Sequence, residues 1–320
     1  GSSPSGRSTV DRIDFTSDTS TAAPKGNLSV GKRKHSSTGN KSFGYFGGGT
    51  NPSSPVLSTI DRIDYSNDTP TAVAKGPLSV ARSGQGAFSS REGGLPTEKI
   101  YSTTISNIGN EEVSGTKNTT EGRGYVLGGY YPTSSPSTHV SIVQRIDFTN
   151  DTATAVEKGS LSGNRSNVAG NISNQDYGYV VGGYAGMSTV DRTDFANDTA
   201  AAVAKGPLTY NIYAAGGFSN ANYGYQLGGS PGAGGSSKVS RIDFSNDGAD
   251  ALVRGSITGN SGSYFNGGTG NQFYGYISVG TSKSLVDRID YSSDTANTTP
   301  KGPLTQEKHA RAGVSNANFG

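Results

Sequence analysis

The sequence predicts an all-β protein of the β-propeller class, built from repeats of about fifty residues. Three observations support this prediction: the composition suits short strands and turns, one signature motif recurs along the whole chain, and each repeat divides into four short segments. Small antiparallel sheets repeated in this way close into a propeller, because each sheet buries its faces against its neighbours.

The composition is that of a folded protein rich in strands and turns. The 320 residues include 48 glycines, 17 tyrosines and 11 phenylalanines, and 31% of the chain is hydrophobic. Charged residues make up 16% and the net charge is +2, whereas disordered chains usually carry a high charge. The regularly placed aromatic residues therefore indicate a packed core.

Charge and cysteine content exclude several function classes. A near-neutral chain is a poor match for nucleic acid, because phosphate binding needs a clustered basic surface. The one dense basic run, residues 32–35, is interpreted as a solvated loop. No apolar run is long enough to span a bilayer, so we expect no membrane insertion. Cysteine is absent, which excludes disulfides and thiol chemistry.

A motif of the form Arg-Ile-Asp-aromatic occurs six times, once with Thr in place of Ile. A second aspartate follows six residues after each arginine, and a basic-Gly pair comes next. The arginines with their first aspartates are Arg12 and Asp14, Arg62 and Asp64, Arg145 and Asp147, Arg192 and Asp194, Arg241 and Asp243, and Arg288 and Asp290. The second aspartates are Asp18, Asp68, Asp151, Asp198, Asp247 and Asp294.

The spacing of the motif is regular except at one place. Successive arginines are separated by 50, 83, 47, 49 and 47 residues. The long interval holds a degenerate copy at residues 98–101, which predicts seven four-stranded blades with the third short and divergent. The alternative is six blades with an insertion at about residues 83–123.

On the seven-blade prediction the whole chain, residues 1–320, is a single propeller. A closing blade combines residues 8–25 with 303–320. We expect closure because the chain starts just before a third-strand motif and ends at the opening of a second strand, which would bring the termini together and remove exposed sheet edges. The other blades are predicted at residues 26–76, 77–115 (divergent), 116–159, 160–206, 207–255 and 256–302.

These units resemble kelch repeats. A typical unit has an aromatic-Gly-Tyr start and a Gly-Gly end to one strand, a variable loop, the Arg-Ile-Asp-aromatic strand and an Asx-rich turn. Val279-Gly280 replaces one of the Gly-Gly pairs. The resemblance covers essentially the whole chain, although kelch units usually carry a tryptophan and this chain has none. The amino-acid sequence of the repeats is also similar to that of repeat proteins from marine cyanobacterial tailed phages. That resemblance implies a virion or tail-fibre component.

The repeated arginines and aspartates are interpreted as structural. A ligand site usually breaks the symmetry of a repeat, whereas these residues recur in six units, so we expect bidentate Arg–Asp contacts that tie strand to turn. Enzymes on propellers need additional groups that stand outside the repeat, and no acid/base pair does so here. We therefore predict a non-enzymatic protein with no catalytic residues, no cofactor and no metal.

Function is expected where the blades differ. Loops between second and third strands share one face with the connections between blades, and they vary in sequence. Exposed tyrosines offer a large contact area there. The candidate binding residues are Tyr130, Tyr131, Asn51 and Met187.

Together these features predict a structural or binding propeller in a phage virion or fibre. Its expected partners are another virion protein or a host-surface glycan or protein. The alternative is a cellular kelch-type module for protein–protein interaction, and a glycan-acting enzyme is the weakest of the three hypotheses.

Overall fold

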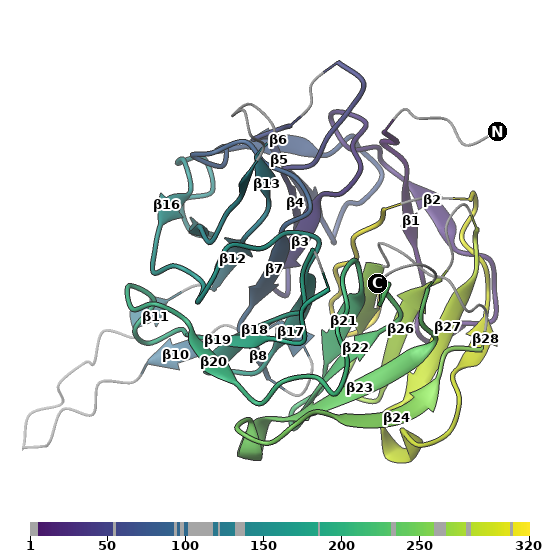
Figure 1. Cartoon of the computed structure of the whole chain (residues 1–320). Helices are drawn as coiled ribbons and strands as arrows, with labels where there is room; N and C mark the ends of the chain where they lie inside the picture. The colour runs from purple at the N-terminus through teal and green to yellow at the C-terminus, as the bar shows by residue number, and fades with distance from the viewer. Residues whose placement is uncertain are drawn as a thin grey trace, which may run out of the picture.

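The computed structural model describes residues 6–53, 56–92, 95–96, 99–101, 118–120, 122–131, 138–184, 186–231, 235–258, 267–279, 283–307 and 310–320. Within them lie five four-stranded antiparallel sheets and a further pair, β1 (Val10–Arg12) with β2 (Ala23–Lys25). Figure 1 shows the sheets arranged around a common centre, as the blades of a propeller are. In the described part of the chain, no helix is long and apolar enough to cross a membrane.

Four of the sheets follow the chain without interruption. The first contains β3 (Ser36–Gly39), β4 (Phe43–Gly47), β5 (Ile60–Asp64) and β6 (Val73–Lys75). The next contains β17 (Ala169–Ser173), β18 (Tyr177–Val181), β19 (Val190–Asp194) and β20 (Val203–Lys205). Then come β21 (Gly216–Ser219), β22 (Tyr223–Leu227), β23 (Lys238–Asp243) and β24 (Leu252–Ser256). The last contains β25 (Gly267–Gly270), β26 (Tyr274–Ser278), β27 (Val286–Asp290) and β28 (Thr299–Lys301). Short 3-10 turns follow two motif strands, at η1 (Phe244–Asn246) and η2 (Tyr291–Ser293).

The remaining four-stranded sheet corrects the prediction of a separate blade at residues 77–115. It contains β7 (Gly86–Ser89), β12 (Arg123–Leu127), β15 (Val143–Asp147) and β16 (Val156–Glu157). β7 pairs directly with β12 in register, so the intervening chain is inserted between the first and second strands of one sheet. Its described residues form two small ladders, β8 (Arg91–Glu92) with β9 (Leu95–Pro96) and β10 (Lys99–Tyr101) with β11 (Asn118–Thr120).

The chain ends meet as the sequence predicts. Ile13 and Gly320 exchange two backbone hydrogen bonds, of 2.6 and 3.1 Å, which add the C-terminal segment to the end of β1. Asn316 accepts from the backbone amides of Asn318 and Phe319, as an asparagine does in the turn before β4, β18, β22 and β26. In Figure 1 the purple β1 and β2 lie beside the yellow β27 and β28.

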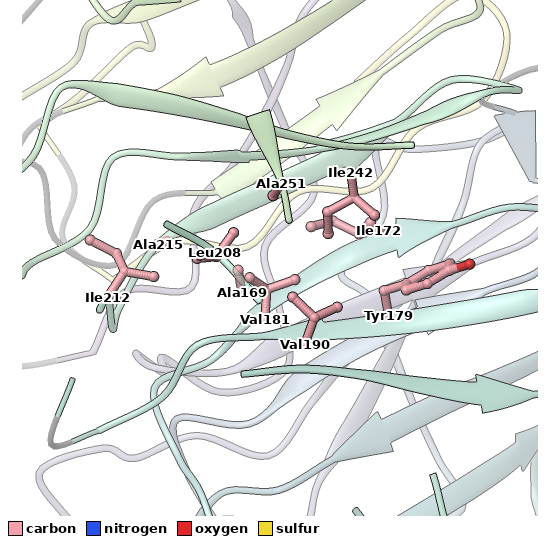
Figure 2. Packing of buried hydrophobic residues seen from close by; sticks show 10 residues of the cluster. All are labelled: Ala169, Ile172, Tyr179, Val181, Val190, Leu208, Ile212, Ala215, Ile242 and Ala251. Atoms are coloured by element: carbon pink, nitrogen blue, oxygen red, sulfur yellow. The ribbon is translucent and has the colours of Figure 1, made fainter. Parts of the chain in front are cut away.

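The core is divided among the interfaces between neighbouring sheets. Figure 2 shows one such cluster, in which Ile172, Tyr179 and Val190 meet Leu208 and Ile242. These side chains are at most 3% exposed. Strands of a blade are packed on both faces, so the motif strands carry apolar residues on both sides instead of alternating cleanly.

Backbone hydrogen bonds also run around the inner ends of the sheets. The amide of Gly84 donates to the carbonyl of Lys34, Asn167 to Gly84, Ala214 to Asn167, and Lys34 to Ala310. Lys34, Asn167, Ala214 and Ala310 have φ of 52–55°, a left-handed conformation that costs energy outside glycine. In Lys34, Asn167 and Ala214 this conformation accompanies an amide that donates to a carbonyl of the preceding blade.

Candidate functional site

The motif arginines join neighbouring sheets. Each donates from Nη1 to the second aspartate of the next blade, over 2.7–2.9 Å. The pairs are Arg12–Asp68, Arg62–Asp151, Arg145–Asp198, Arg192–Asp247, Arg241–Asp294 and Arg288–Asp18. The last pair returns to the N-terminal strands, so the six links form a closed cycle.

A tyrosine and a second cation bind the same aspartates. Tyr179 donates its hydroxyl to Asp247 over 2.9 Å, and Lys205 contacts the other carboxylate oxygen at 3.0 Å. Burial opposes ionisation of Asp247, but the hydrogen bonds from Lys205 and Tyr179 and the charge of Arg192 hold its pKa below the usual value. Burial, together with the adjacent Asp247, raises the pKa of Tyr179 well above its usual value.

The first aspartates have a different role from the predicted one. Asp14 accepts hydrogen bonds from the amide and hydroxyl of Thr16, which closes the turn after the motif strand. Asp64, Asp147, Asp194, Asp243 and Asp290 accept from the corresponding amide two residues on. The arginine contact therefore crosses between blades through one nitrogen, instead of being the bidentate contact from strand to turn that we expected.

The basic run at residues 32–35 is not a solvated loop. Lys32 forms a 2.9 Å ion pair with Asp61, and both side chains are fully buried. Burial lowers the pKa of His35 to about 3, and the charge of Lys32 acts in the same direction. The pair recurs in another blade, where Arg165 lies 2.8 Å from Asp191 and both side chains are again buried. Lys32 and Arg165 each follow the conserved leucine of their repeat by four residues, so the repeat pattern does carry a signal for this arrangement.

The face formed by the loops between second and third strands carries the strongest candidate for a binding site. Tyr130 lies in β13 (Tyr130–Tyr131), which pairs with β14 (Thr138–His139). This short ladder extends from the ends of β12 and β15. It places the Tyr130 and His139 rings 5.7 Å apart.

The aromatic contacts continue across the neighbouring sheets. His139 stacks on Tyr184, from the loop between β18 and β19, with ring centroids 4.8 Å apart. Tyr184 meets Tyr213, from the connection between β20 and β21, edge-on at 6.0 Å. We call Tyr130, His139, Tyr184 and Tyr213 the aromatic row. Tyr184 is 49% exposed, so this side chain is accessible to a ligand.

The aromatic row contains only part of the predicted site. Tyr130 belongs to it, and Met187 lies beside it, with its backbone amide donating to Gly183. Tyr131 pairs with Thr138 in the same ladder, and Asn51 caps its own loop by accepting from Ser53. None of the described contacts joins Asn51 to the row.

Three members of the aromatic row, His139, Tyr184 and Tyr213, were not predicted from the sequence. The sequence nevertheless holds a signal for Tyr184 and Tyr213. Tyr184 follows Gly182-Gly183 as Tyr130 follows Gly128-Gly129, so an aromatic residue after the Gly-Gly pair marks this face. Tyr213 precedes Ala214, one of the left-handed residues, at a position where other repeats have Arg33, Ser83 and Ser166. His139 is brought to Tyr130 by the pairing of β13 with β14, which a loop sequence alone does not predict.

The row offers flat, uncharged contact surfaces. Burial lowers the pKa of His139, which favours the neutral imidazole at neutral pH. Its Nδ1 lies 2.9 Å from the hydroxyl of Ser166, a contact that fixes the ring. Stacked rings held in this way can pack against the apolar faces of a ligand while their polar edges form hydrogen bonds. The described residues contain no cluster of three or more His, Asp or Glu side chains that could hold a metal ion.

Comparison with solved structures shows the fold. The protein in "Structure of YjhT" superposes with a TM-score of 0.63 at 11% sequence identity, and the match covers 90% of this chain and 88% of that one. The chain is a kelch-like β-propeller. No family model matches the sequence, and no curated protein does.

Proposed function

We propose that this propeller is a non-enzymatic binding protein whose aromatic row binds a glycan. The observation that carries the proposal is the stacking of His139 on Tyr184, with Tyr184 half-exposed. Elsewhere the recurring polar residues are engaged in joining the blades, whereas the row differs from blade to blade, as a ligand site does.

The geometry favours an elongated, uncharged ligand. The row crosses parts of three neighbouring sheets, and its members are tyrosines and a histidine with a lowered pKa. The apolar faces of sugar rings stack on such side chains, and the hydroxyls of Tyr130 and Tyr184 can bond to sugar hydroxyls. A rigid platform made of tyrosine loses little conformational entropy on binding.

The proposed setting is the surface of a phage particle. The repeat sequences resemble those of tailed-phage proteins. This resemblance supports a role as a virion or fibre component that contacts a host-surface glycan or another virion protein. A propeller with six blades suits this role, and the six Arg–Asp links around the cycle support that number. The competing hypothesis, a cellular kelch-type module, predicts that the same face binds a protein.

A glycan array followed by calorimetry tests the proposal. We expect retention of a neutral oligosaccharide without turnover, and a loss of affinity of about tenfold, or about 1.4 kcal/mol, in Tyr184→Ala. Phe273→Ala is the matched control. Phe273 is 60% exposed but lies in the turn between β25 and β26, at the opposite ends of the strands, so affinity should not change.

Two results would count against the proposal. Equal losses in Tyr184→Ala and Phe273→Ala would mean that the row is not the site. Release of a shortened glycan would show that the protein is an enzyme.

A further inference from the structure

A pocket of about 60 Å³ lies at the centre of the propeller, where the first strands of the sheets meet. β3 contacts β7, β7 contacts β17, β17 contacts β21 and β21 contacts β25, so these strands surround the common centre seen in Figure 1. All five strands line the pocket, together with residues 310–312, and none of the four residues of the aromatic row does. We call it the axial pocket.

The polar side chains of the axial pocket come from one side. β21 and β25 line it with glycines alone, whereas residues 34–37, before and within β3, are Lys, His, Ser and Ser. Arg311 lies next to this polar wall, because the amide of Lys34 donates to the carbonyl of Ala310. The lining residues that the structure describes include no aspartate or glutamate. The pocket therefore combines two cations with a wall of neutral polar groups.

The two cations break the symmetry of the repeat. Lys34 comes six residues after the leucine that follows each basic-Gly pair, and Arg311 comes seven residues after it. The position of Lys34 is occupied in other blades by Gly84, Asn167, Ala214 and Ala310. The position of Arg311 is occupied in other blades by His35, Gln85, Val168 and Ala215. A scaffold role would repeat around the cycle, whereas these two charges occur together at one place, as in a ligand site.

Burial strengthens the attraction of both cations for an anion. Burial lowers the pKa of Lys34, and the charge of Arg33 acts in the same direction. Burial also lowers the pKa of Arg311 to about 10, so its guanidinium stays charged at neutral pH. Arg311 donates from Nη2 to the carbonyl of Lys283, which fixes the guanidinium in place. Charges that are partly removed from water are screened less than charges on an open surface.

Two neutral side chains in the same wall have unused hydrogen-bonding atoms. Ser36 is 5% exposed, and its Oγ has no hydrogen-bond partner among the described residues. The Nδ1 of His35 is also buried, and no described residue bonds to it. Buried polar groups are normally hydrogen-bonded, so these two atoms indicate a ligand. The hydroxyl can donate, and a neutral imidazole can carry its proton on Nδ1.

We propose that the axial pocket binds a small oxyanion of the phosphate class. Lys34 and Arg311 supply the positive charge, while Ser36 Oγ and His35 Nδ1 donate hydrogen bonds to the oxygens. The planar guanidinium of arginine matches the spacing of two phosphate oxygens. The volume of about 60 Å³ suits an ion or a single phosphate group. This site is separate from the aromatic row and does not depend on glycan binding.

Titration calorimetry with inorganic phosphate tests the proposal. We expect saturable binding to the unmodified protein, weakened at least about tenfold in Lys34→Ala and in Arg311→Gln, because each change removes a charged donor. Both substitutions introduce a residue that other blades already carry at that position. Ala214 and Ala310 even share the left-handed conformation of Lys34, with φ of 54° and 55°. Melting temperatures of the variants show whether each one folds.

Lys41→Ala is the matched control. Lys41 is exposed in the turn between β3 and β4, at the ends of these strands opposite to Lys34. The control removes the same charge from the same sheet, so phosphate should bind this variant as it binds the unmodified protein.

Glycerol 3-phosphate distinguishes a free ion from the phosphate group of a larger ligand. Equal or weaker binding than that of inorganic phosphate would mean that the pocket holds the free ion. Tighter binding would mean that the phosphate group belongs to a molecule that extends out of the pocket. Either result supports the site.

Three results would overturn the proposal. The first is no saturable binding of either probe at millimolar concentration. The second is an equal loss of affinity in Lys41→Ala and Lys34→Ala, which would mean that the anion is attracted by net charge alone. The third is unchanged affinity in Lys34→Ala, and this variant decides the question even where Arg311→Gln fails to fold.

Discussion

Tyr179 illustrates how single residues hold this fold together. Its ring is fully buried and stacks on Phe244 at 5.0 Å, while its hydroxyl bonds to Asp247. Arg192 packs over the ring of Tyr177 at 4.1 Å and reaches the same carboxylate. One aspartate thus gathers groups from three strands of the preceding blade, since Lys205 lies on β20.

Removing one hydroxyl tests this arrangement. Tyr179→Phe keeps the stacking but leaves Asp247 without one donor, so we expect the free energy of unfolding to fall by about 1.5–3 kcal/mol. Urea denaturation measures the change. Tyr184→Phe removes a hydroxyl from a half-exposed ring and should have almost no effect, so equal losses in the two variants would contradict the buried role of Tyr179.

At the scale of the strand and its connection, the basic-Gly pair sets the distance between blades. The amide of Gly206 donates to the carbonyl of Asp247 over 2.8 Å. A Cβ at Gly206 would overlap the carbonyl oxygen of Ala249. Glycine is needed at this position because the two backbones approach too closely for any side chain.

The close approach predicts a large effect of one methyl group. Gly206→Ala should lower stability by about 1–3 kcal/mol, since the connection must shift away from the next blade. Gly248→Ala is the control, because a Cβ there meets nothing within 4 Å. Thermal melts of the two variants should differ clearly, and similar melting temperatures would show that the inter-blade contact is not rigid.

The strands and turns were largely predictable from the sequence. The contacts between them, namely which aspartate each arginine binds and which strands pair, were not. The Arg-Ile-Asp strands, the turns after them and the meeting of the chain ends all follow from local patterns. Asp247 and Asp198 occupy the same place in successive repeats, so the pattern cannot tell whether Arg192 binds the aspartate of its own unit or of the next. The pairing of β7 with β12 spans more than thirty residues, and a degenerate motif in between suggested a separate blade.

At the scale of the whole molecule, the fold is a cycle of sheets joined by carboxylates. Arg288 and Tyr276 of the last four-stranded sheet bind Asp18, which follows β1. The stability of the closed cycle therefore depends on several aspartates remaining ionised together. Hydrogen bonds and nearby cations overcome the opposing effect of burial and lower the pKa of Asp18, Asp151, Asp198 and Asp247.

This dependence predicts the response to acid. A carboxyl whose pKa is lower in the folded state stabilises the fold above its unfolded pKa of about 3.9, and that stabilisation is lost as the pH falls through the folded value. We expect the melting temperature to decrease steeply below about pH 4.

The variant Asp247→Asn should be less stable than the unmodified protein at pH 7. Its free energy of unfolding should fall less steeply as the pH is lowered, by up to about 1.4 kcal/mol per pH unit, because one fewer proton is taken up on unfolding. Asp250→Asn, which removes an exposed carboxylate from the turn before β24, serves as the control. Parallel profiles for Asp247→Asn and the unmodified protein would show that this link does not contribute to acid unfolding.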